Sequence, residues 1–149
     1  MTLAAPPVWR DVFRRVEHVD TDAAGVVHFA RYASLLETAV LENLEHVNAG
    51  IRRLEREGLD LAVVEARMRY SAAARFYEEL RIRVRLDRLA GASCQFTGEI
   101  CRTAPGPETV LATGALTLCT VNRASGAPTG LPRWLRDNLR TCGNGDGNG

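Results

Sequence analysis

Two aspartates, a glycine and a histidine lie close together near the N-terminus, in the segment VDTDAAGVVHFARY (residues 19–32). Aspartate and glycine are common at helix caps and tight turns, so the segment has an ordinary interpretation as the start of a helix. The same residues also suit catalysis, because a carboxylate serves as a general base or nucleophile and the free N–H groups of a helix N-terminus stabilise developing negative charge. The elements around the segment decide between these interpretations.

A long amphipathic helix is predicted directly after this segment. Apolar residues recur at steps of three and four from about residue 27, and the pattern ends at the sequence NAG, residues 48–50. The residues expected on its apolar face are Phe29, Tyr32, Ala33, Leu36, Val40, Leu44 and Val47. A first strand over residues 11–19 precedes the helix, and a short helical piece over residues 51–57 follows it.

Beyond Gly58 the sequence predicts four long strands in which apolar and polar side chains alternate. These strands span residues 61–70, 79–89, 92–102 and 109–121. The residues expected to face inward are Ala62, Val64, Ala66, Met68, Tyr70, Ile82, Val84, Leu86, Cys94, Phe96, Ile100, Val110, Ala112, Leu116 and Leu118. Strands of this length with one apolar face favour an antiparallel sheet curved around the single long helix.

The chain is long enough for one domain, expected over residues 1–140. A short helix is predicted over residues 131–140, and the Gly- and Asn-rich tail over residues 141–149 is expected to be disordered. The outer face of the predicted sheet carries apolar residues among arginines and threonines, which predicts subunit contacts. These apolar residues are Val63, Leu111, Ala115 and Cys119.

The composition argues against several classes of function. The formal net charge is +1, so no overall field favours nucleic acid or an anionic membrane as a partner. No apolar stretch approaches the ~20 residues of a membrane span and the N-terminus lacks the pattern of a signal peptide, so we expect a cytoplasmic protein. The cysteines Cys94, Cys101, Cys119 and Cys142 lack the spacing of a zinc site and are expected as free thiols. No metal or redox cofactor is indicated.

Together, the order of elements and the opening segment resemble the 4-hydroxybenzoyl-CoA thioesterase family. The signature of that family is roughly D-x-D-x-x-G-x-V-x-x-x-x-Y, and its positions are occupied here by Asp20, Asp22, Gly25, Val27 and Tyr32. The resemblance covers about residues 12–139, including the blocks YSAAARFYEELRIRVRL and LPRWLRDNL. It implies an α+β hotdog fold, in which a curved antiparallel sheet of about five strands wraps a long central helix.

The function implied by the resemblance is hydrolysis of a thioester, which releases an acyl group from coenzyme A or from the phosphopantetheine of an acyl carrier protein. Asp22 corresponds to the catalytic base or nucleophile, and the backbone amide of Phe29 corresponds to the donor that polarises the thioester carbonyl. Gly25 corresponds to the glycine of the tight turn, while Val27 and Tyr32 are expected to contact substrate.

The resemblance also implies a homodimer or homotetramer with shared active sites, because the helix start of one subunit faces strands of its partner in such proteins. Arginine supplies all nineteen basic residues, a composition that is associated with GC-rich bacteria. On this basis a role in polyketide or fatty-acid biosynthesis is a further expectation.

The roles of four further residues are also considered. Asp20 is expected to cap or orient the loop, rather than take part in the chemistry. His28 either assists proton transfer, binds substrate or lies at a subunit interface; some members of the family have histidine one place later. Arg81 and Arg83 share one face of a predicted strand. They either bind phosphate groups of the substrate or form a solvated or subunit-contacting surface.

Two other functions compete with thioester hydrolysis. A hydratase or dehydratase on the same fold usually has an Asp and a His at a shorter spacing, or a His before a Phe-Pro-Gly turn. Here Asp22 and His28 are six residues apart and that turn is absent. A non-catalytic, acyl-binding hotdog subunit is the other possibility, and the presence of Asp22, Gly25 and the helix start argues against it.

Overall fold

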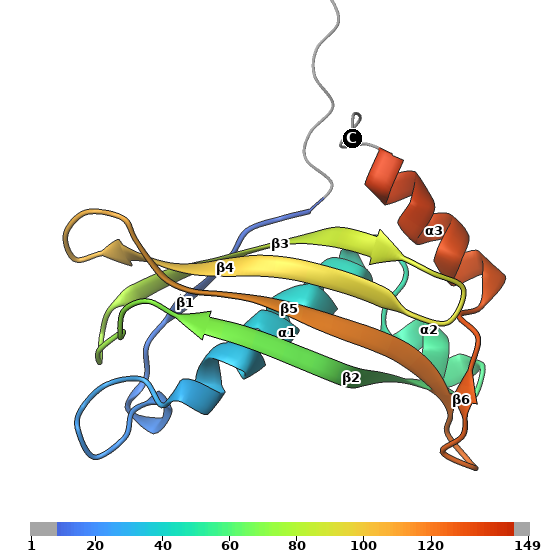
Figure 1. Cartoon of the computed structure of the whole chain (residues 1–149), viewed down its shortest axis with the longest axis horizontal. Coiled ribbons are helices and arrows are strands. Elements are labelled where there is room, and N and C mark those ends of the chain that lie inside the picture. The colour runs from blue at the N-terminus through green and yellow to red at the C-terminus, as the bar shows by residue number, and fades with distance from the viewer. Residues whose placement is uncertain (1–8, 145–149) are drawn as a thin grey trace, which may run out of the picture.

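The computed structural model describes residues 9–144 and contains a curved antiparallel sheet laid over one long helix (Figure 1). The strands are β1 (Val12–Arg15), β2 (Leu59–Tyr70), β3 (Glu79–Leu89), β4 (Cys94–Ala104), β5 (Thr109–Asn122) and β6 (Pro128–Thr129). The helices are α1 (Phe29–His46), α2 (Ile51–Arg56) and α3 (Arg133–Asn144), with a 3₁₀ turn η1 (His18–Asp20). The sheet order is β1-β3-β4-β5-β2, and β6 pairs with β5. Within the described residues, no helix is long and apolar enough to cross a membrane.

Helix α1 forms where the three- and four-residue periodicity predicted it. Its buried residues are Tyr32, Leu35, Leu36, Ala39, Val40, Asn43 and Leu44. The expectation that Phe29 belongs to this buried face is wrong, because its side chain is 65% exposed at the first turn of the helix. The helix ends at His46, and the left-handed residue Asn48 (φ 58°) follows it.

A glycine in the middle of the sheet lets α1 approach the sheet closely. Val84, Gly98, Gly114 and Met68 are paired across β3, β4, β5 and β2. A Cβ atom on Gly98 would lie 2.5 Å from Leu36 Cδ1 and 2.7 Å from the carbonyl oxygen of Arg83. The absence of a side chain at Gly98 therefore determines how close α1 lies to the sheet.

Two register shifts change the faces that simple alternation predicts. A shift between Ile100 and Cys101 of β4 makes Leu111 an extra residue of β5. Leu111 is buried and Val110 is 42% exposed, the reverse of the expectation for both residues. The residue pattern of a single strand does not reveal a bulge, because a bulge is defined only by how that strand pairs with its neighbour.

The second shift lies in the edge strand β2, between Val63 and Glu65. As a result Val63 is paired with Leu118 and shares the inner face with Ala66, whereas the sequence placed Ala62 and Val64 on that face. Both Val63 and Val64 are substantially exposed, at 38% and 58%. Strand β2 is thus an edge strand with exposed apolar side chains, and no other strand of residues 9–144 pairs with its outer side.

The two ends of the domain also differ from the expectation. The first strand stops at Arg15 and the chain then turns through η1, so the predicted strand over residues 11–19 is too long. Helix α3 continues through Asn144, so residues 141–144 are helical rather than part of a tail. The remainder of the predicted tail, residues 145–149, lies outside the described residues.

All four cysteines are free thiols, as predicted. Cys94 lies on the helix side of β4, where burial raises the pKa of its thiol to about 12. A thiol held in its protonated form by burial is a packing residue rather than a nucleophile.

The glycine at position 98 gives a direct test of the helix seating. We expect Gly98→Ala to lower the free energy of unfolding by about 2 kcal/mol, because the new Cβ overlaps Leu36 and the backbone of Arg83. Urea unfolding followed by circular dichroism measures the change. Gly91→Ala is the matched control, because a Cβ there meets nothing within 4 Å. Equal unfolding midpoints for the two variants would contradict the tight seating of α1.

Candidate active site

The loop before α1 is a tight hairpin closed by backbone hydrogen bonds. Thr21 and Val27 form an isolated bridge, the Asp22 N–H donates to the Val26 carbonyl (2.9 Å), and the Gly25 N–H donates to the Asp22 carbonyl (3.0 Å). Gly25 has φ +80°, a left-handed conformation that glycine adopts without strain. A Cβ at Gly25 would meet nothing within 4 Å, so the requirement for glycine is conformational.

This hairpin is fastened to the segment that connects β2 and β3. The Val27 N–H donates to the Ala74 carbonyl (2.8 Å), and the Ala74 N–H donates to the Tyr32 hydroxyl (3.0 Å). Val27 and Tyr32 are 4% and 3% exposed, and burial raises the pKa of the Tyr32 phenol. In the single chain these two residues therefore anchor the loop, and their expected contact with substrate stays a prediction.

Asp20 is buried and both of its carboxylate oxygens are occupied. Oδ2 accepts from the Glu17 N–H (2.9 Å), and Oδ1 accepts from Nε (2.9 Å) and Nη2 (2.8 Å) of Arg31. The Asp20 carbonyl accepts from the His28 N–H (2.9 Å). These contacts fix the loop against the first turn of α1, which is the orienting role expected of Asp20.

Asp22 is exposed, and only one of its oxygens is used by the loop. Oδ1 accepts from the N–H groups of Ala24 (2.8 Å) and Val26 (3.4 Å). Among residues 9–144, Oδ2 has no hydrogen bond and no ion pair. The loop thus holds the carboxylate in place while leaving one oxygen available for a substrate or a water molecule.

The first turn of α1 carries an amide for which the described part of the chain offers no acceptor. His28 is the N-cap: its Nδ1 accepts from the Ala30 N–H (3.2 Å), and its carbonyl accepts from the Arg31 N–H (2.9 Å). No hydrogen bond within residues 9–144 involves the N–H of Phe29. Because the N-terminus of a helix carries partial positive charge, this N–H is suited to receive a partially negative oxygen.

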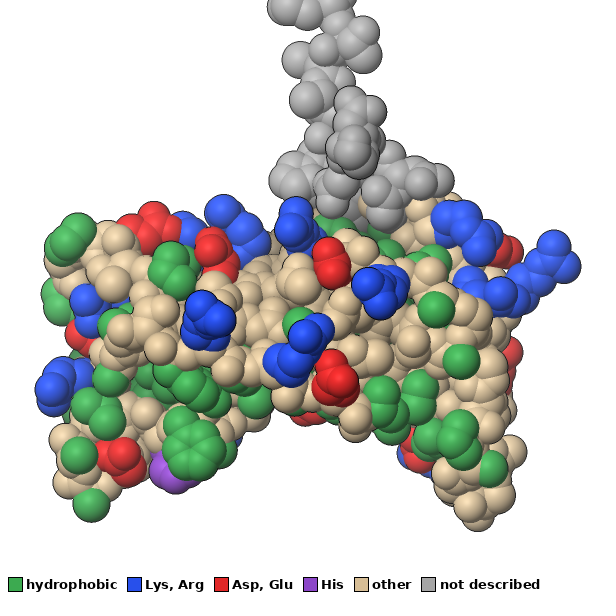
Figure 2. All heavy atoms as spheres, viewed as in Figure 1, with side chains coloured by type: hydrophobic (Ala, Val, Ile, Leu, Met, Phe, Trp, Pro, Cys, Tyr) green, Lys and Arg blue, Asp and Glu red, His purple; other side chains and the backbone are tan. Residues whose placement is uncertain are grey.

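Tyr70, at the end of β2, is a further residue of this region, which the sequence placed only on an inner face. Its hydroxyl donates to the Phe29 carbonyl (3.1 Å), and its ring packs edge-on to Phe29 and Tyr32, with centroids 6.5 and 5.5 Å apart. The only signal in the sequence was its place at the start of the block YSAAARF. Hydrophobic side chains and a histidine gather at the end of the molecule where α1 begins (Figure 2).

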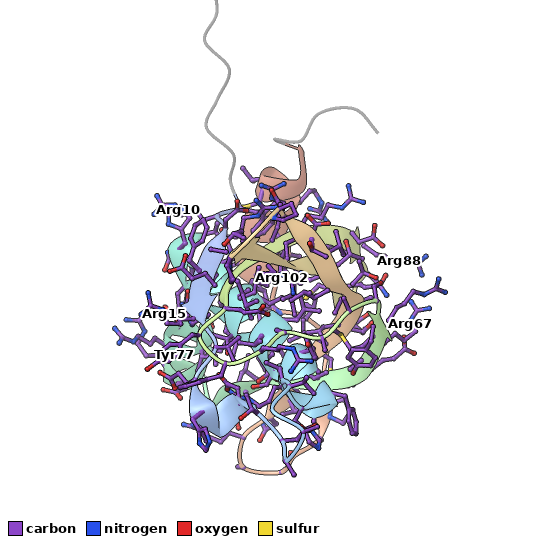
Figure 3. All side chains as sticks on the ribbon, turned by 90° about the vertical axis from the view of Figure 1, so that its left-hand side faces the viewer. Arg10, Arg15, Arg67, Tyr77, Arg88 and Arg102 are labelled. Atoms are coloured by element: carbon purple, nitrogen blue, oxygen red, sulfur yellow. The ribbon has the colours of Figure 1, made fainter. Side chains whose placement is uncertain are left out.

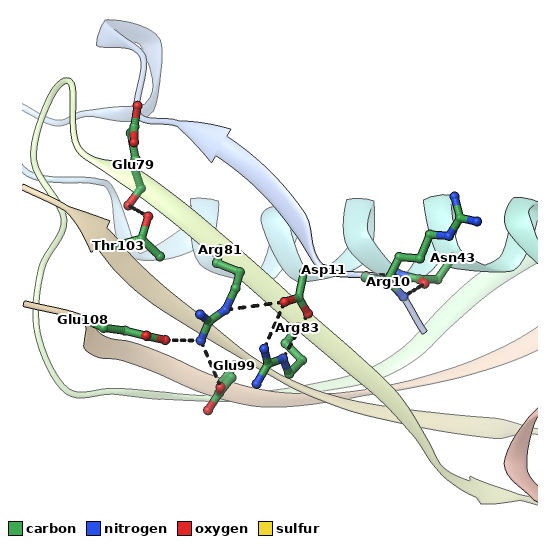
Figure 4. Close-up of polar contacts among 9 residues, drawn as sticks. All are labelled: Arg10, Asp11, Asn43, Glu79, Arg81, Arg83, Glu99, Thr103 and Glu108. Carbon is green, nitrogen blue, oxygen red and sulfur yellow. Dashed lines mark hydrogen bonds and ion pairs between the residues drawn. The ribbon is translucent and has the colours of Figure 1, made fainter. Parts of the chain in front are cut away.

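The structure does not bring Arg81 and Arg83 close to the loop that holds Asp22. They lie on the outer face of β3, where Arg83 donates to both oxygens of Asp11 (3.0 Å each) and Arg81 pairs with Glu108, Asp11 and Glu99 (Figure 4). Hydrogen bonds from Arg83 hold the pKa of Asp11 below its usual value. Both guanidinium groups are thus already paired with carboxylates, which favours the interpretation of this face as a structural surface.

Two cavities lie near these groups, and neither is lined by Asp22. The larger, about 960 Å³, is bordered by Trp9, Phe13, Arg83 and Arg85. The smaller, about 370 Å³, lies between β1 and α1 and includes Val27. The single chain therefore does not enclose an acyl group beside the free oxygen of Asp22 in either of them.

The comparisons with known sequences agree on one family. A family model described as the thioesterase-like superfamily matches residues 16–139. The chain is 30% identical over 119 residues to the acyl-CoA thioester hydrolase YbgC of Escherichia coli, covering 80% of this chain and 87% of that protein. It is 30% identical over 138 residues to a 1,4-dihydroxy-2-naphthoyl-CoA hydrolase of Synechococcus, covering 85% and 89%.

Solved structures with the same arrangement include the dynemicin thioesterase, whose crystal structures are described as revealing effects of polyene binding. It superposes with a TM-score of 0.78 at 28% identity, covering 88% of this chain and 94% of that chain. These similarities extend over nearly all of the described elements.

The Asp11–Arg83 pair yields a test of the structural interpretation of that face. Because the folded-state pKa of Asp11 is depressed, its stabilisation is present above about pH 4 and is lost as pH falls through the folded pKa. We expect Asp11→Asn to cost up to about 1 kcal/mol of unfolding free energy at pH 7, a difference that narrows in acid.

Urea unfolding at several pH values measures the effect, in a cycle with Arg83→Gln and the double variant. A destabilisation by Asp11→Asn that persisted undiminished below pH 3 would contradict the ion-pair origin. Purely additive single effects would contradict a direct interaction between the two side chains.

Proposed function

The chain belongs to the thioesterase-like superfamily and is a thioester hydrolase of the hotdog fold, and we propose that it cleaves acyl-CoA thioesters with Asp22 as the catalytic carboxylate. Support for the substrate class comes from the relatives in Escherichia coli and Synechococcus, which are named as hydrolases of acyl-CoA and 1,4-dihydroxy-2-naphthoyl-CoA. Family membership also disfavours the hydratase and the non-catalytic alternatives.

One observation carries the assignment of Asp22. Of the two aspartates in the motif, Asp20 has both oxygens committed to Glu17 and Arg31, whereas Asp22 keeps Oδ2 free. A base or nucleophile needs such an unoccupied lone pair. In the general-base route, Oδ2 takes a proton from water as the water oxygen bonds to the acyl carbon. In the nucleophilic route, Oδ2 itself forms that bond, and water hydrolyses the resulting anhydride.

The oxyanion that forms on the acyl carbonyl needs a donor, and we assign this role to the N–H of Phe29. It is the first amide of α1, it has no acceptor within the described residues, and the helix dipole adds positive potential there. When the C–S bond breaks, the carbonyl reforms and the sulfur leaves as the thiolate of coenzyme A, which is then protonated. Desolvation of the site would strengthen the hydrogen bond to the oxyanion.

A second subunit is part of this proposal, because the chain alone leaves the site open. Strand β2 is an edge strand of twelve residues, and most of its side chains are exposed on both faces. We propose that β2 and the start of α1 meet a partner chain, so that each acyl pocket is shared across a homodimer or within a tetramer. Such an assembly would cover Phe29, Val64 and Tyr70, which are 65%, 58% and 46% exposed.

A carrier-protein thioester is the second candidate substrate. The similarity to the dynemicin thioesterase, at 28% identity over most of both chains, favours a role in polyketide biosynthesis. The chemistry at the acyl carbon is the same, so hydrolysis rates for matched acyl-CoA and acyl-carrier-protein substrates separate the two candidates.

The catalytic assignment is tested with Asp22→Asn. The amide oxygen of Asn can still accept from Ala24 and Val26, so the loop is expected to keep its shape, but Asn neither takes a proton nor attacks the carbonyl. We expect a loss of at least ~100-fold in kcat/KM for acyl-CoA, measured by release of the free thiol. Asp137→Asn, at an exposed position of α3, is the control and should match the wild type. Unchanged turnover by Asp22→Asn would exclude Asp22 from the mechanism.

The shared site is tested with Ala66→Arg. Ala66 is exposed in the middle of β2, so the single chain tolerates a large side chain, whereas an interface would bury an unpaired charge. We expect the variant to sediment as a monomer and to lose ~10-fold or more of its activity because the pocket is incomplete. Ala124→Arg, in the exposed turn after β5, is the control. A wild type that is monomeric and fully active would rule out the shared site.

A further inference from the structure

The peptide group between Phe29 and Ala30 is hydrogen-bonded at both ends. Its carbonyl accepts from the Tyr70 hydroxyl (3.1 Å), and its N–H donates to Nδ1 of His28 (3.2 Å). The result is a continuous chain, O–H···O=C–N–H···N, from the end of β2 to the imidazole ring. Bonds in such a chain polarise one another, so each supports the next.

This arrangement assigns the tautomer of His28. A neutral imidazole has one N–H and one acceptor nitrogen, and Nδ1 is the acceptor here, so the proton is on Nε2. The ring is exposed and stacked on Phe29, with centroids 4.6 Å apart and planes at 27°. Within residues 9–144, Nε2 has no hydrogen-bond partner, so its N–H is available to a ligand at the helix start.

We propose that Tyr70 is a positioning residue that acts through the Phe29–Ala30 peptide, and that the neutral His28 it helps to hold donates a hydrogen bond from Nε2 to the substrate instead of serving as a base. This inference rests on the proposed thioesterase function and decides a role that the sequence left open. With the lone pair of Nδ1 engaged by the Ala30 N–H and with Nε2 protonated, the neutral ring has no free lone pair for a proton from water. Proton transfer therefore remains with Asp22, and a neutral histidine at a helix N-terminus polarises a carbonyl group.

The tautomer has a direct spectroscopic readout. In ¹⁵N–¹H correlation spectra of the imidazole nitrogens at neutral pH, recorded on the wild type and His28→Asn to assign the signal, we expect the proton of His28 on Nε2. A proton on Nδ1, or an even mixture of the two tautomers, would overturn the proposal. This measurement requires no turnover, so it stands whatever the substrate proves to be.

Two substitutions of His28 separate its role as the N-cap of α1 from its proposed role as a hydrogen-bond donor through Nε2. His28→Asn keeps an N-cap acceptor but has no group where Nε2 lies, whereas His28→Gln extends an amide N–H toward that place and is a poor N-cap. We expect His28→Asn to lower kcat roughly 10- to 100-fold with an unchanged Tm. His28→Gln should keep kcat within about 10-fold of the wild type while its Tm falls by about 2–4 °C. Full activity in His28→Asn would show that His28 is only a cap.

Tyr70→Phe tests the positioning role, since it removes one hydroxyl and keeps the ring contacts with Phe29 and Tyr32. We expect kcat to fall about 5-fold with KM and Tm unchanged, and no further loss when Tyr70→Phe is added to His28→Asn. Tyr77→Phe is the matched control: Tyr77 is exposed and points outward, and its hydroxyl has no partner among the described residues (Figure 3). Wild-type kcat in Tyr70→Phe, or additive losses in the double variant, would contradict the relay.

The outcomes also separate this inference from the proposed function. Absence of acyl-CoA hydrolysis by the wild type, or full activity of Asp22→Asn, would refute the function. If Asp22→Asn is inactive while His28→Asn and Tyr70→Phe turn over like the wild type, the function stands and only the roles of His28 and Tyr70 are wrong.

Discussion

The close packing of α1 against the sheet is the constraint on which the rest of the structure depends. Leu36 occupies the space that a side chain at Gly98 would need, and Val40 and Leu44 continue the same buried contact along the helix. Because the helix is held at this depth, the position of its first turn relative to the strands is fixed. The exposed Phe29 lies beyond the covered region, and its N–H has no acceptor among residues 9–144.

The loop that leads into α1 places two aspartates, Asp20 and Asp22, in different environments. Asp20 points into the structure, and a buried carboxylate is stable only when it is paired, which Arg31 and the Glu17 amide provide. Asp22, two residues later, is on the solvent side of the hairpin and is held by one oxygen. A paired, buried carboxylate and a carboxylate with one free oxygen are thus built from neighbouring residues, and the first fixes the loop that holds the second.

The two faces of the sheet serve different purposes. The inner face buries Ile82 and Val84 against α1, while the alternate residues Arg81 and Arg83 form ion pairs on the outer face. Alternation along a strand requires this separation. The arginines that the sequence offered as phosphate ligands are therefore paired with carboxylates from the residue before β1, from β4 and from the turn before β5.

The sequence by itself determined α1, the four long strands and the motif loop, because hydrophobic periodicity and the glycine turn are local properties of the chain. Through a family resemblance, the sequence also predicted that Asp22 and the start of the helix act together in catalysis. Only the tertiary structure decided the bulges at Leu111 and in β2, and the hydrogen bond from Tyr70 to Phe29, across 41 residues. The physical reason is that register and long-range hydrogen bonds depend on which strands become neighbours, and no local pattern of side chains specifies that.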